Sequence, residues 1–246
     1  MNKKKIVCFT GAGLDKESGI LTFRDVKTGL WMNYNIDDVC TPAGWRKDRE
    51  KVLNFYNERR RELPNVQPNE AHKALFKLEE FFDVTHITQN VSDLLERSGC
   101  TTVYHLHGEL TKARGAMYHH KVSPADPIID VGYNDIKIGD KCPTTDSQLR
   151  PHVVFFEEYP FNIIESYYAL EHADVLLIIG TSLEITYTIS MLASVNKKAN
   201  IYYIDPNPST NLQSANLPIE FIKEPATIGV PKIVDELIKN NIEIKE

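Results

Sequence analysis

Short apolar segments recur along this chain, and helix-forming segments lie between most of them. The apolar segments are residues 5–10, 84–89, 103–106, 153–156, 175–180 and 201–204. The helix-forming segments are residues 49–62, 69–82, 162–172 and 232–239. Apolar runs without polar alternation are typical of strands that are buried on both faces, as in a parallel sheet. The alternation therefore predicts an α/β fold with a doubly wound, mainly parallel, Rossmann-like sheet.

Two segments do not follow this alternation of strands and helices. Residues from about 26 to 81 are helical and polar, and residues from about 110 to 151 are rich in Gly, Pro, Asp and His. We interpret both as insertions between sheet strands that together form a smaller lobe. With 42% hydrophobic residues in 246, the chain can bury one sizeable core, so we expect a single domain over residues 1–246. The larger lobe is then made from about 1–25, 82–109 and 152–246.

Charge and cysteine content limit the partners and the compartment. The net charge is -6, so bulk electrostatic attraction to nucleic acid is not expected. No segment approaches the ~20 apolar residues of a membrane span, and the apolar run after Lys3-Lys4-Lys5 is too short for an export signal. The four cysteines form no C-x-x-C pair; they are Cys8, Cys40, Cys100 and Cys142. We expect a cytoplasmic protein without disulfides and without nucleic-acid or membrane partners, and a monomer as its simplest state.

A glycine turn follows the first apolar segment. Gly11-Ala12-Gly13 stands where that strand should end. Glycine lets the backbone approach a phosphate closely, and the N-terminus of a following helix favours an anion. The third glycine of G-x-G-x-x-G is missing, so a purely structural turn is the simpler interpretation of this feature alone.

Five segments, in order, resemble the sequence motifs of sirtuins. They are GAGLDKESGILTFR (11–24, with Gly29-Leu30-Trp31 after it), TQNV (88–91), HLHGEL (105–110), RPHVVFF (150–156) and GTSL (180–183). The corresponding family patterns are G-A-G-I-S-x-x-S-G-I-P-x-F-R, T-Q-N-I, H-x-H-G-E-L, R-P-x-V-V-W-F and G-T-S-L. The resemblance covers nearly the whole chain.

This resemblance implies a reaction in which NAD is consumed. Sirtuins remove an acyl group from a protein lysine and release nicotinamide and O-acyl-ADP-ribose, so it implies NAD as cofactor and an acyl-lysine protein or peptide as partner. Two other functions remain open. One is mono-ADP-ribosyl transfer or plain NAD hydrolysis, and the other is a non-catalytic module that binds NAD or ADP-ribose.

The resemblance also implies roles for individual residues. His107 corresponds to the general base, and histidine suits that role because its unperturbed pKa lies near working pH. Asn90 corresponds to the residue that orients the nicotinamide ribose, whereas His105 is expected to be structural. The implied cofactor-binding residues are Gly11, Ala12, Gly13, Leu14, Phe23, Arg24, Trp31, Gln89, Asn90, Val91, Ser92, Gly180, Thr181, Ser182, Asp205 and Ala226. Without the motifs, ordinary strand-end and capping roles would be the simpler interpretation of most of them.

The segment from Phe55 to Arg61 resembles the F-Y-x-x-R-R run of bacterial class III sirtuins. Tyr56 and Arg59 are three residues apart, so they share one face of a helix. A guanidinium and a phenol on that face would hold the carboxylate of a succinyl or malonyl group. The alternative is an exposed basic helix with Tyr56 as a packing residue. Val154 and Phe156 are expected to line the channel where a substrate peptide pairs as a strand.

The family usually carries two cysteine pairs that bind a structural zinc in the smaller lobe. Here the matching stretch contains one cysteine, Cys142, and the adjacent His119 and His120 would diverge on a strand. Tetrahedral zinc needs four convergent ligands, so no zinc is expected.

Three further departures from the family pattern fall near the expected site. Ser92 replaces an Asp that contacts the nicotinamide amide in the family, and Asp15 replaces a Ser near the diphosphate, where its charge is expected to repel. Glu157 replaces a Gly beside the peptide channel. Together these departures are expected to affect deacylation more than NAD binding.

Overall fold

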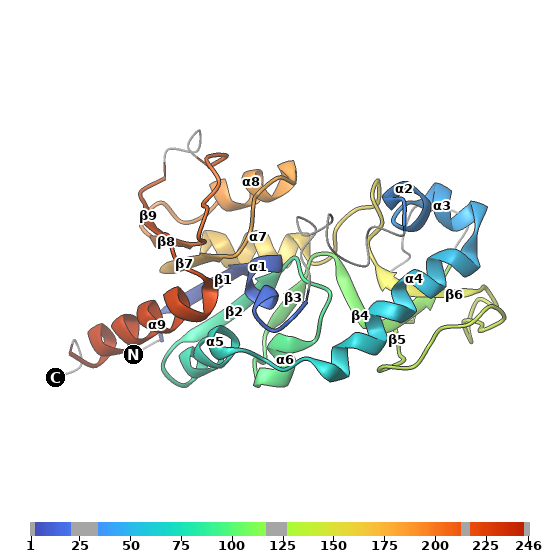
Figure 1. Ribbon diagram of the computed structural model, residues 1–246. Coiled ribbons are helices and arrows are strands. Elements are labelled where there is room, and N and C mark those ends of the chain that lie inside the picture. Colours follow the sequence, from blue (N-terminus) through green and yellow to red (C-terminus); the bar gives the residue numbers. More distant parts are fainter. Residues whose placement is uncertain (1–2, 21–33, 117–126, 213–216, 244–246) are drawn as a thin grey trace.

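The computed structural model describes residues 3–20, 34–116, 127–212 and 217–243 (Figure 1). Six parallel strands form the larger sheet, in the order β3-β2-β1-β7-β8-β9. Their bounds are β1 Lys5–Thr10, β2 Asp83–Thr88, β3 Val103–His105, β7 Val175–Ile179, β8 Asn200–Ile204 and β9 Ile219–Ile222. The predicted doubly wound, mainly parallel α/β sheet is therefore confirmed.

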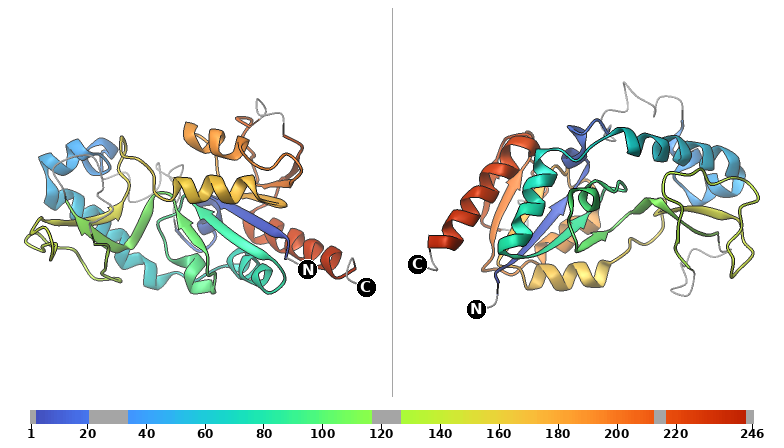
Figure 2. Two further views of the ribbon diagram at one scale, coloured as in Figure 1. Left: turned by 180° about the vertical axis from the view of Figure 1, so that it is seen from behind. Right: turned by 90° about the horizontal axis from the view of Figure 1, so that it is seen from below.

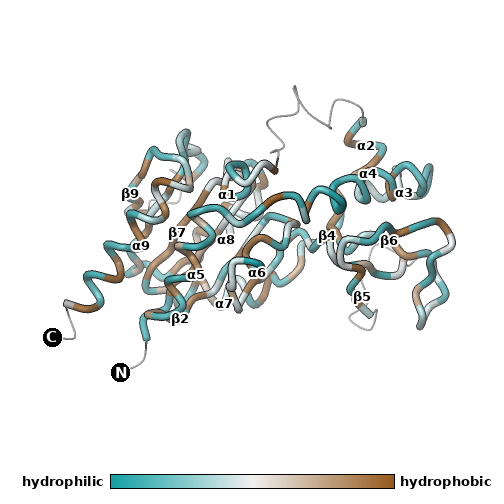
Figure 3. Tube along the Cα trace, turned by 60° about the horizontal axis from the view of Figure 1, so that its bottom comes forward, coloured by the Kyte–Doolittle hydropathy of each residue, from teal (hydrophilic) through white to brown (hydrophobic). Residues whose placement is uncertain are grey.

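Helices cover both faces of this sheet (Figures 1 and 2). Successive strand side chains point to opposite faces, so Ile6 and Cys8 of β1 join one core while Val7 and Phe9 join the other. The first core packs against α1 Ala12–Lys16, α5 Glu70–Phe81, α6 Leu94–Ser98 and α9 Ala226–Glu243. The second packs against α7 Ile163–Glu171 and α8 Thr186–Ala193. Hydrophilic and hydrophobic positions alternate along α9, as expected of a helix with one buried face (Figure 3).

A smaller lobe with its own core lies beside the sheet (Figure 1). Its antiparallel strands follow the order β5-β4-β6, with β4 Gly108–Gly115, β5 Ile129–Asp130 and β6 Leu149–Val153. Its helices are α2 Ile36–Val39, α3 Pro42–Lys47 and α4 Arg49–Glu62, and a 3-10 turn, η3 Leu63–Asn65, follows α4. Asn35, Thr41 and Asp48 cap the three helices by accepting backbone N–H bonds.

Two expectations about these elements are wrong in detail. Residues 153–156 were expected to form a strand of the parallel sheet, but β6 ends at Val153 and pairs antiparallel with β4 in the smaller lobe. An apolar run identifies a buried strand but does not say which sheet buries it. Strand β9 is missing from the expected set because it is a half-exposed edge strand with no continuous apolar run.

Helix α5 lies with the larger sheet, although the expected insertion of residues 26–81 included it. Its buried apolar residues are Ala71, Ala74, Leu75 and Leu78, which join the core of β1 and pack toward α9. The spacing of three and four residues gives one apolar stripe, and that stripe needs the wide sheet face. The segment that builds the smaller lobe therefore ends before α5.

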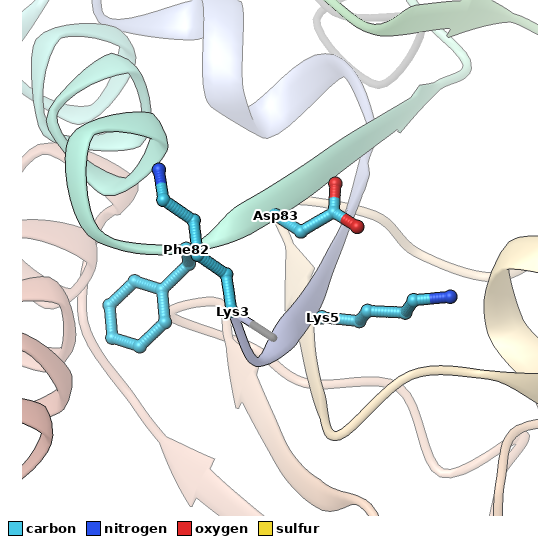
Figure 4. A pocket seen from close by; sticks show the side chains of 4 residues that line it. All are labelled: Lys3, Lys5, Phe82 and Asp83. Atoms are coloured by element: carbon cyan, nitrogen blue, oxygen red, sulfur yellow. The ribbon is translucent and has the colours of Figure 1, made fainter. Parts of the chain in front are cut away.

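Two general features complete the fold. Within the described residues, no helix is both long enough and apolar enough to cross a bilayer. A surface pocket lined by Lys3, Lys5, Phe82 and Asp83 lies where β1 and β2 begin (Figure 4). That edge is opposite to the one where these strands end, and ligands of open α/β sheets bind at the carboxyl ends of the strands.

Candidate active site

The predicted cofactor residues gather at the carboxyl edge of the larger sheet. Gly11-Ala12-Gly13 follows β1, Gln89 and Asn90 follow β2, and Gly180-Thr181-Ser182 follows β7. Strand β1 lies between β2 and β7, so all three turns are neighbours. The strand order reverses at this point, which is where open α/β sheets bind ligands.

The two glycine turns pack directly on each other. The Gly13 N–H donates to the Gly180 carbonyl oxygen at 2.7 Å. A Cβ atom at Gly13 would stand 2.6 Å from Gly180 Cα, and Gly180 has φ +57°. Glycine is required here by close backbone approach, so the structural interpretation of the turn is correct as far as packing goes.

The turn after β2 is tied to both glycine turns. The Asn90 amide donates to the Gly11 carbonyl oxygen at 3.0 Å. The Thr181 hydroxyl donates to the Gln89 amide oxygen at 2.7 Å. The amides of Gln89 and Asn90 are thus held in place by two other predicted cofactor-binding residues, Thr181 and Gly11.

His107 is fixed in one tautomer by its hydrogen bonds. Its Nδ1 lies 2.8 Å from the carbonyl oxygen of Gln89, which can only accept, so Nδ1 carries the proton and Nε2 presents a lone pair. That Nε2 lies 2.8 Å from the Tyr187 hydroxyl, which therefore donates. Burial lowers the pKa of His107, so the imidazole stays neutral to a lower pH than an exposed histidine does. A neutral imidazole that already accepts from a hydroxyl has the state of a general base.

Tyr187 was not identified by the sequence analysis. It lies on α8, outside the five motifs, and burial raises the pKa of its phenol. Nothing local marks it, because its contact with His107 spans 80 residues.

His105 has the surroundings of a structural residue. Its Nδ1 lies 2.8 Å from the Asn90 carbonyl oxygen and its Nε2 lies 2.7 Å from a Glu96 carboxylate oxygen. Burial lowers the pKa of His105, but the hydrogen bond and charge of Glu96 outweigh it, so the pKa is raised. Both ring nitrogens are occupied, which leaves none for a substrate proton.

Tyr56 and Arg59 are brought together at the buried side of α4. The Tyr56 hydroxyl donates to Cys40 Sγ at 3.6 Å, and its ring stacks on Phe155 at 5.9 Å. The Arg59 guanidinium carbon lies 3.3 Å from the centre of the Phe55 ring. The Arg59 side chain is 13% exposed, whereas that of Arg61 is 55% exposed. Arg59 is therefore not exposed, as the alternative of an exposed basic helix would require, whereas Tyr56 packs as that alternative expects.

The segment after β6 connects this cluster to His107. The Val154 N–H donates to the His107 carbonyl oxygen, and the Phe156 N–H donates to the Cys40 carbonyl oxygen. The Phe156 side chain is exposed, whereas Phe155 is buried against Tyr56. Phe155, which the sequence analysis did not single out, is thus the residue of this segment that faces the cluster.

The remaining predicted cofactor residues are spread along the same edge or lie in the core. Asp205 follows β8 and accepts the Asn207 N–H at 2.7 Å. Ala226 is buried where α9 begins, and the Leu14 side chain is buried in the sheet core. Three predicted cofactor residues fall outside the described residues: Phe23, Arg24 and Trp31.

Comparison with known proteins gives consistent matches over most of the chain. The model of the Sir2 family matches residues 11–187. An NAD-dependent protein deacylase of Helicobacter pylori is 42% identical over 239 residues, which is 96% of this chain and 98% of that protein. One of Aggregatibacter actinomycetemcomitans is 44% identical over 83% of this chain and 94% of that protein.

The chain belongs to the Sir2 family.

Solved structures agree with this assignment. A Sir2 homologue in complex with NAD superposes with a TM-score of 0.82 at 31% identity, covering 97% of this chain and 91% of that one. A Sir2 homologue mutant in complex with ADP-ribose gives 0.79 at 33% identity, covering 98% and 93%. The sirtuin resemblance of the five motifs is therefore confirmed.

Two departures from the Sir2 motifs meet in one hydrogen bond. The Ser92 hydroxyl donates to Asp15 Oδ2 at 2.6 Å, and His72 Nε2 lies 3.2 Å from Asp15 Oδ1. The Asp15 side chain is 5% exposed. The carboxylate that was expected to repel the diphosphate is thus engaged by two donors inside the protein.

The third departure places a side chain in a backbone conformation that favours glycine. Glu157 has φ +75° and is exposed. A residue with a Cβ atom is strained there by about 1–2 kcal/mol. The Sir2 pattern has glycine at this position, which avoids the strain.

We predict that Glu157→Gly raises the free energy of unfolding by about 1 kcal/mol, because relief of the strain exceeds the extra chain entropy of glycine. Denaturant unfolding of the two proteins measures it. Glu165→Gly, at an exposed position of α7, is the matched control and should destabilise by about 1 kcal/mol. Equal destabilisation by both substitutions would contradict the prediction.

Possible metal ligands gather at two places among the described residues. Two groups bring three ligand atoms within 4.8 Å: Glu79, His86 and Cys100, and Glu96, His105 and Glu109. Neither includes Cys142, whose Sγ lies 3.3 Å from the Thr144 hydroxyl. Neither group therefore includes the cysteine that stands in the expected zinc stretch.

Proposed function

We propose that this protein removes acyl groups from protein lysines in a reaction that consumes NAD and yields nicotinamide and O-acyl-ADP-ribose. One observation carries the proposal. His107 is neutral, its Nδ1 proton is held by the Gln89 carbonyl oxygen, and its Nε2 accepts from a hydroxyl at 2.8 Å. The relatives named NAD-dependent protein deacylase support the same activity.

The carboxyl edge of the sheet suits NAD. The glycine turns after β1 and β7 pack on each other at this edge, and Ser182 and Asp205 add a hydroxyl and a carboxylate along it. We expect the diphosphate near the glycine turns and the adenosine ribose near Asp205. Bound NAD supplies the electrophilic ribose carbon.

The chain's own residues then orient groups and move one proton. Asn90 and Gln89 present amides that can donate to and accept from ribose hydroxyls without adding charge. His107 Nε2, which accepts from the Tyr187 hydroxyl at 2.8 Å, would take the proton of a ribose hydroxyl of bound NAD. The Gln89 carbonyl oxygen then stabilises the resulting imidazolium through Nδ1.

We also propose that acidic acyl groups such as succinyl or malonyl are accepted, through Tyr56 and Arg59. The support is that the side chains of Tyr56 and Arg59 both point to the buried side of α4, where Tyr56 stacks on Phe155. Phe155 follows Val154, whose N–H donates to the His107 carbonyl oxygen, so this cluster is connected to the predicted base. Burial lowers the pKa of Arg59, and the neighbouring acidic groups counteract this. A desolvated guanidinium binds a carboxylate more strongly than an exposed one.

We predict that Arg59→Met lowers desuccinylation by about 10-fold to 100-fold, because a charged hydrogen bond is lost, and changes deacetylation much less. Mass spectrometry of succinyl-lysine and acetyl-lysine peptides incubated with NAD measures both rates. Arg61→Met, which removes an exposed arginine of the same helix, is the control. An equal loss on both peptides would show that Arg59 supports the fold rather than acyl choice.

The same assay separates the two other functions. ADP-ribose on protein or free in solution, without loss of acyl-lysine, would indicate ADP-ribosyl transfer or NAD hydrolysis. Tight NAD binding without turnover would indicate a binding module.

We further propose a cytoplasmic monomer that needs no zinc. The four cysteines are free and buried, which suits a reducing compartment. Elemental analysis of the purified protein tests the zinc prediction.

A further inference from the structure

A buried carboxylate lies beside the catalytic turn and is held by neutral groups. Asp15 stands on α1, directly after the glycine turn, and is 3% exposed. Ser92 donates to one of its oxygens at 2.6 Å, and His72 Nε2 lies 3.2 Å from the other. The His72 side chain is fully buried.

The tautomer of His72 follows from its second contact. The Asn69 N–H donates to His72 Nδ1 at 3.3 Å, so Nδ1 is an acceptor and Nε2 carries the proton. His72 therefore donates to Asp15 as a neutral imidazole. Neither this donor nor the Ser92 hydroxyl cancels the negative charge of Asp15. A carboxylate offers about four lone-pair sites, and these two donors use two of them.

This carboxylate is tied to the end of the site that holds His107. One turn makes all the connections: Gln89 accepts from His107, Asn90 donates to Gly11, and Ser92 donates to Asp15. Asp205 lies beyond β7, at the end of β8. The charge of Asp15 is therefore close to the reacting end of the cofactor rather than to the adenosine end.

Two departures from the sirtuin pattern, at positions 15 and 92, account for the position of this carboxylate on α1. The sirtuin pattern has Ser at position 15 and Asp at position 92, and this chain has the reverse. Because the two side chains share one hydrogen bond, exchanging them keeps a hydroxyl–carboxylate pair and moves only the charge. The two departures thus compensate each other.

We propose that Asp15 is the carboxylate that receives the nicotinamide end of NAD, with Ser92 and His72 holding it in place. This rests on the proposed use of NAD. The nicotinamide ring of NAD is cationic and its carboxamide donates two N–H groups. A buried carboxylate with spare acceptor sites complements both features.

Calorimetric binding of NAD and of ADP-ribose, which lacks nicotinamide, tests the proposal. Asp15→Asn keeps the shape and removes the charge; it should weaken NAD binding about 10-fold to 100-fold and leave ADP-ribose binding within about 3-fold. Asp15→Ser should weaken NAD binding similarly, and Asp15→Ser/Ser92→Asp should restore it to within about 3-fold of the native protein. Asp174→Asn is the charge control, because Asp174 directly precedes β7 and accepts the Lys5 N–H at the opposite edge of the sheet.

Three results would overturn the proposal. The first is unchanged NAD affinity in Asp15→Asn, and the second is tighter binding of both ligands, which would place the carboxylate against the diphosphate. The third is a double variant that binds NAD no better than Asp15→Ser. If Asp15→Ser does not fold, the comparison of Asp15→Asn with the native protein decides. Calorimetry measures binding and needs no turnover. If the protein binds NAD without removing acyl groups, the proposed function is refuted, but the role of Asp15 in NAD binding can still be measured.

Discussion

His107→Ala is expected to lower deacylation of an acyl-lysine peptide by about 10²-fold to 10⁴-fold, the usual contribution of a positioned general base. The imidazole is the group whose Nε2 accepts from a hydroxyl at 2.8 Å, and alanine removes that acceptor. NAD binding should change much less, because His107 is tied to Gln89 only through a backbone carbonyl. Steady-state kinetics together with NAD calorimetry separate the two effects.

The pH profile of the native enzyme checks the same role. Burial lowers the pKa of His107 below its ordinary value of about 6.5. A histidine base acts in its neutral form. We therefore expect kcat/KM to stay level at and above the ordinary pKa of histidine, and to fall only as the pH drops through the lowered pKa of His107. His172→Ala, at an exposed histidine, is the control and should leave rate and profile unchanged. Full activity of His107→Ala would show that His107 is not the general base.

Glu158→Gln is expected to lower the free energy of unfolding by about 3–5 kcal/mol, because it breaks a buried ion cluster and leaves charge uncompensated. The Glu158 carboxylate lies 2.6 Å from Arg150 Nη1 and 3.1 Å from Arg114 Nη2. All three side chains are at most 9% exposed. Burial raises the pKa of Glu158, but the two arginines outweigh it and hold the pKa below its usual range.

Such a loss is a large part of the free energy of unfolding of a typical domain, which is roughly 5–15 kcal/mol. Glu158 also accepts the Phe155 N–H at 2.8 Å, so the segment that contacts Tyr56 and His107 should loosen with it. Denaturant unfolding measures the change. Asp135→Asn, which breaks the exposed pair with Arg61, is the control and should have little effect. A loss as small as that of the control would mean that water screens the Glu158 cluster.

Much of the fold and of the candidate site is determined by local sequence. The apolar segments 5–10, 84–89 and 175–180 predict central strands because a strand buried on both faces needs continuous apolar side chains. Turn residues such as Gly11 and Asn90 could be placed at the carboxyl edge because parallel strands end on the same side. Each of these inferences needs only residues that are neighbours in the chain.

Only the tertiary structure decided which distant side chains meet. The Ser92–Asp15 bond spans 77 residues and the His107–Tyr187 contact spans 80. Taken singly in the sequence, Asp15 and Ser92 are two unfavourable departures, and Tyr187 has no distinguishing neighbour. Their meaning depends on how α1, α8 and the turn after β2 pack. That packing is set by the summed burial of both faces of the sheet, so no local pattern records it.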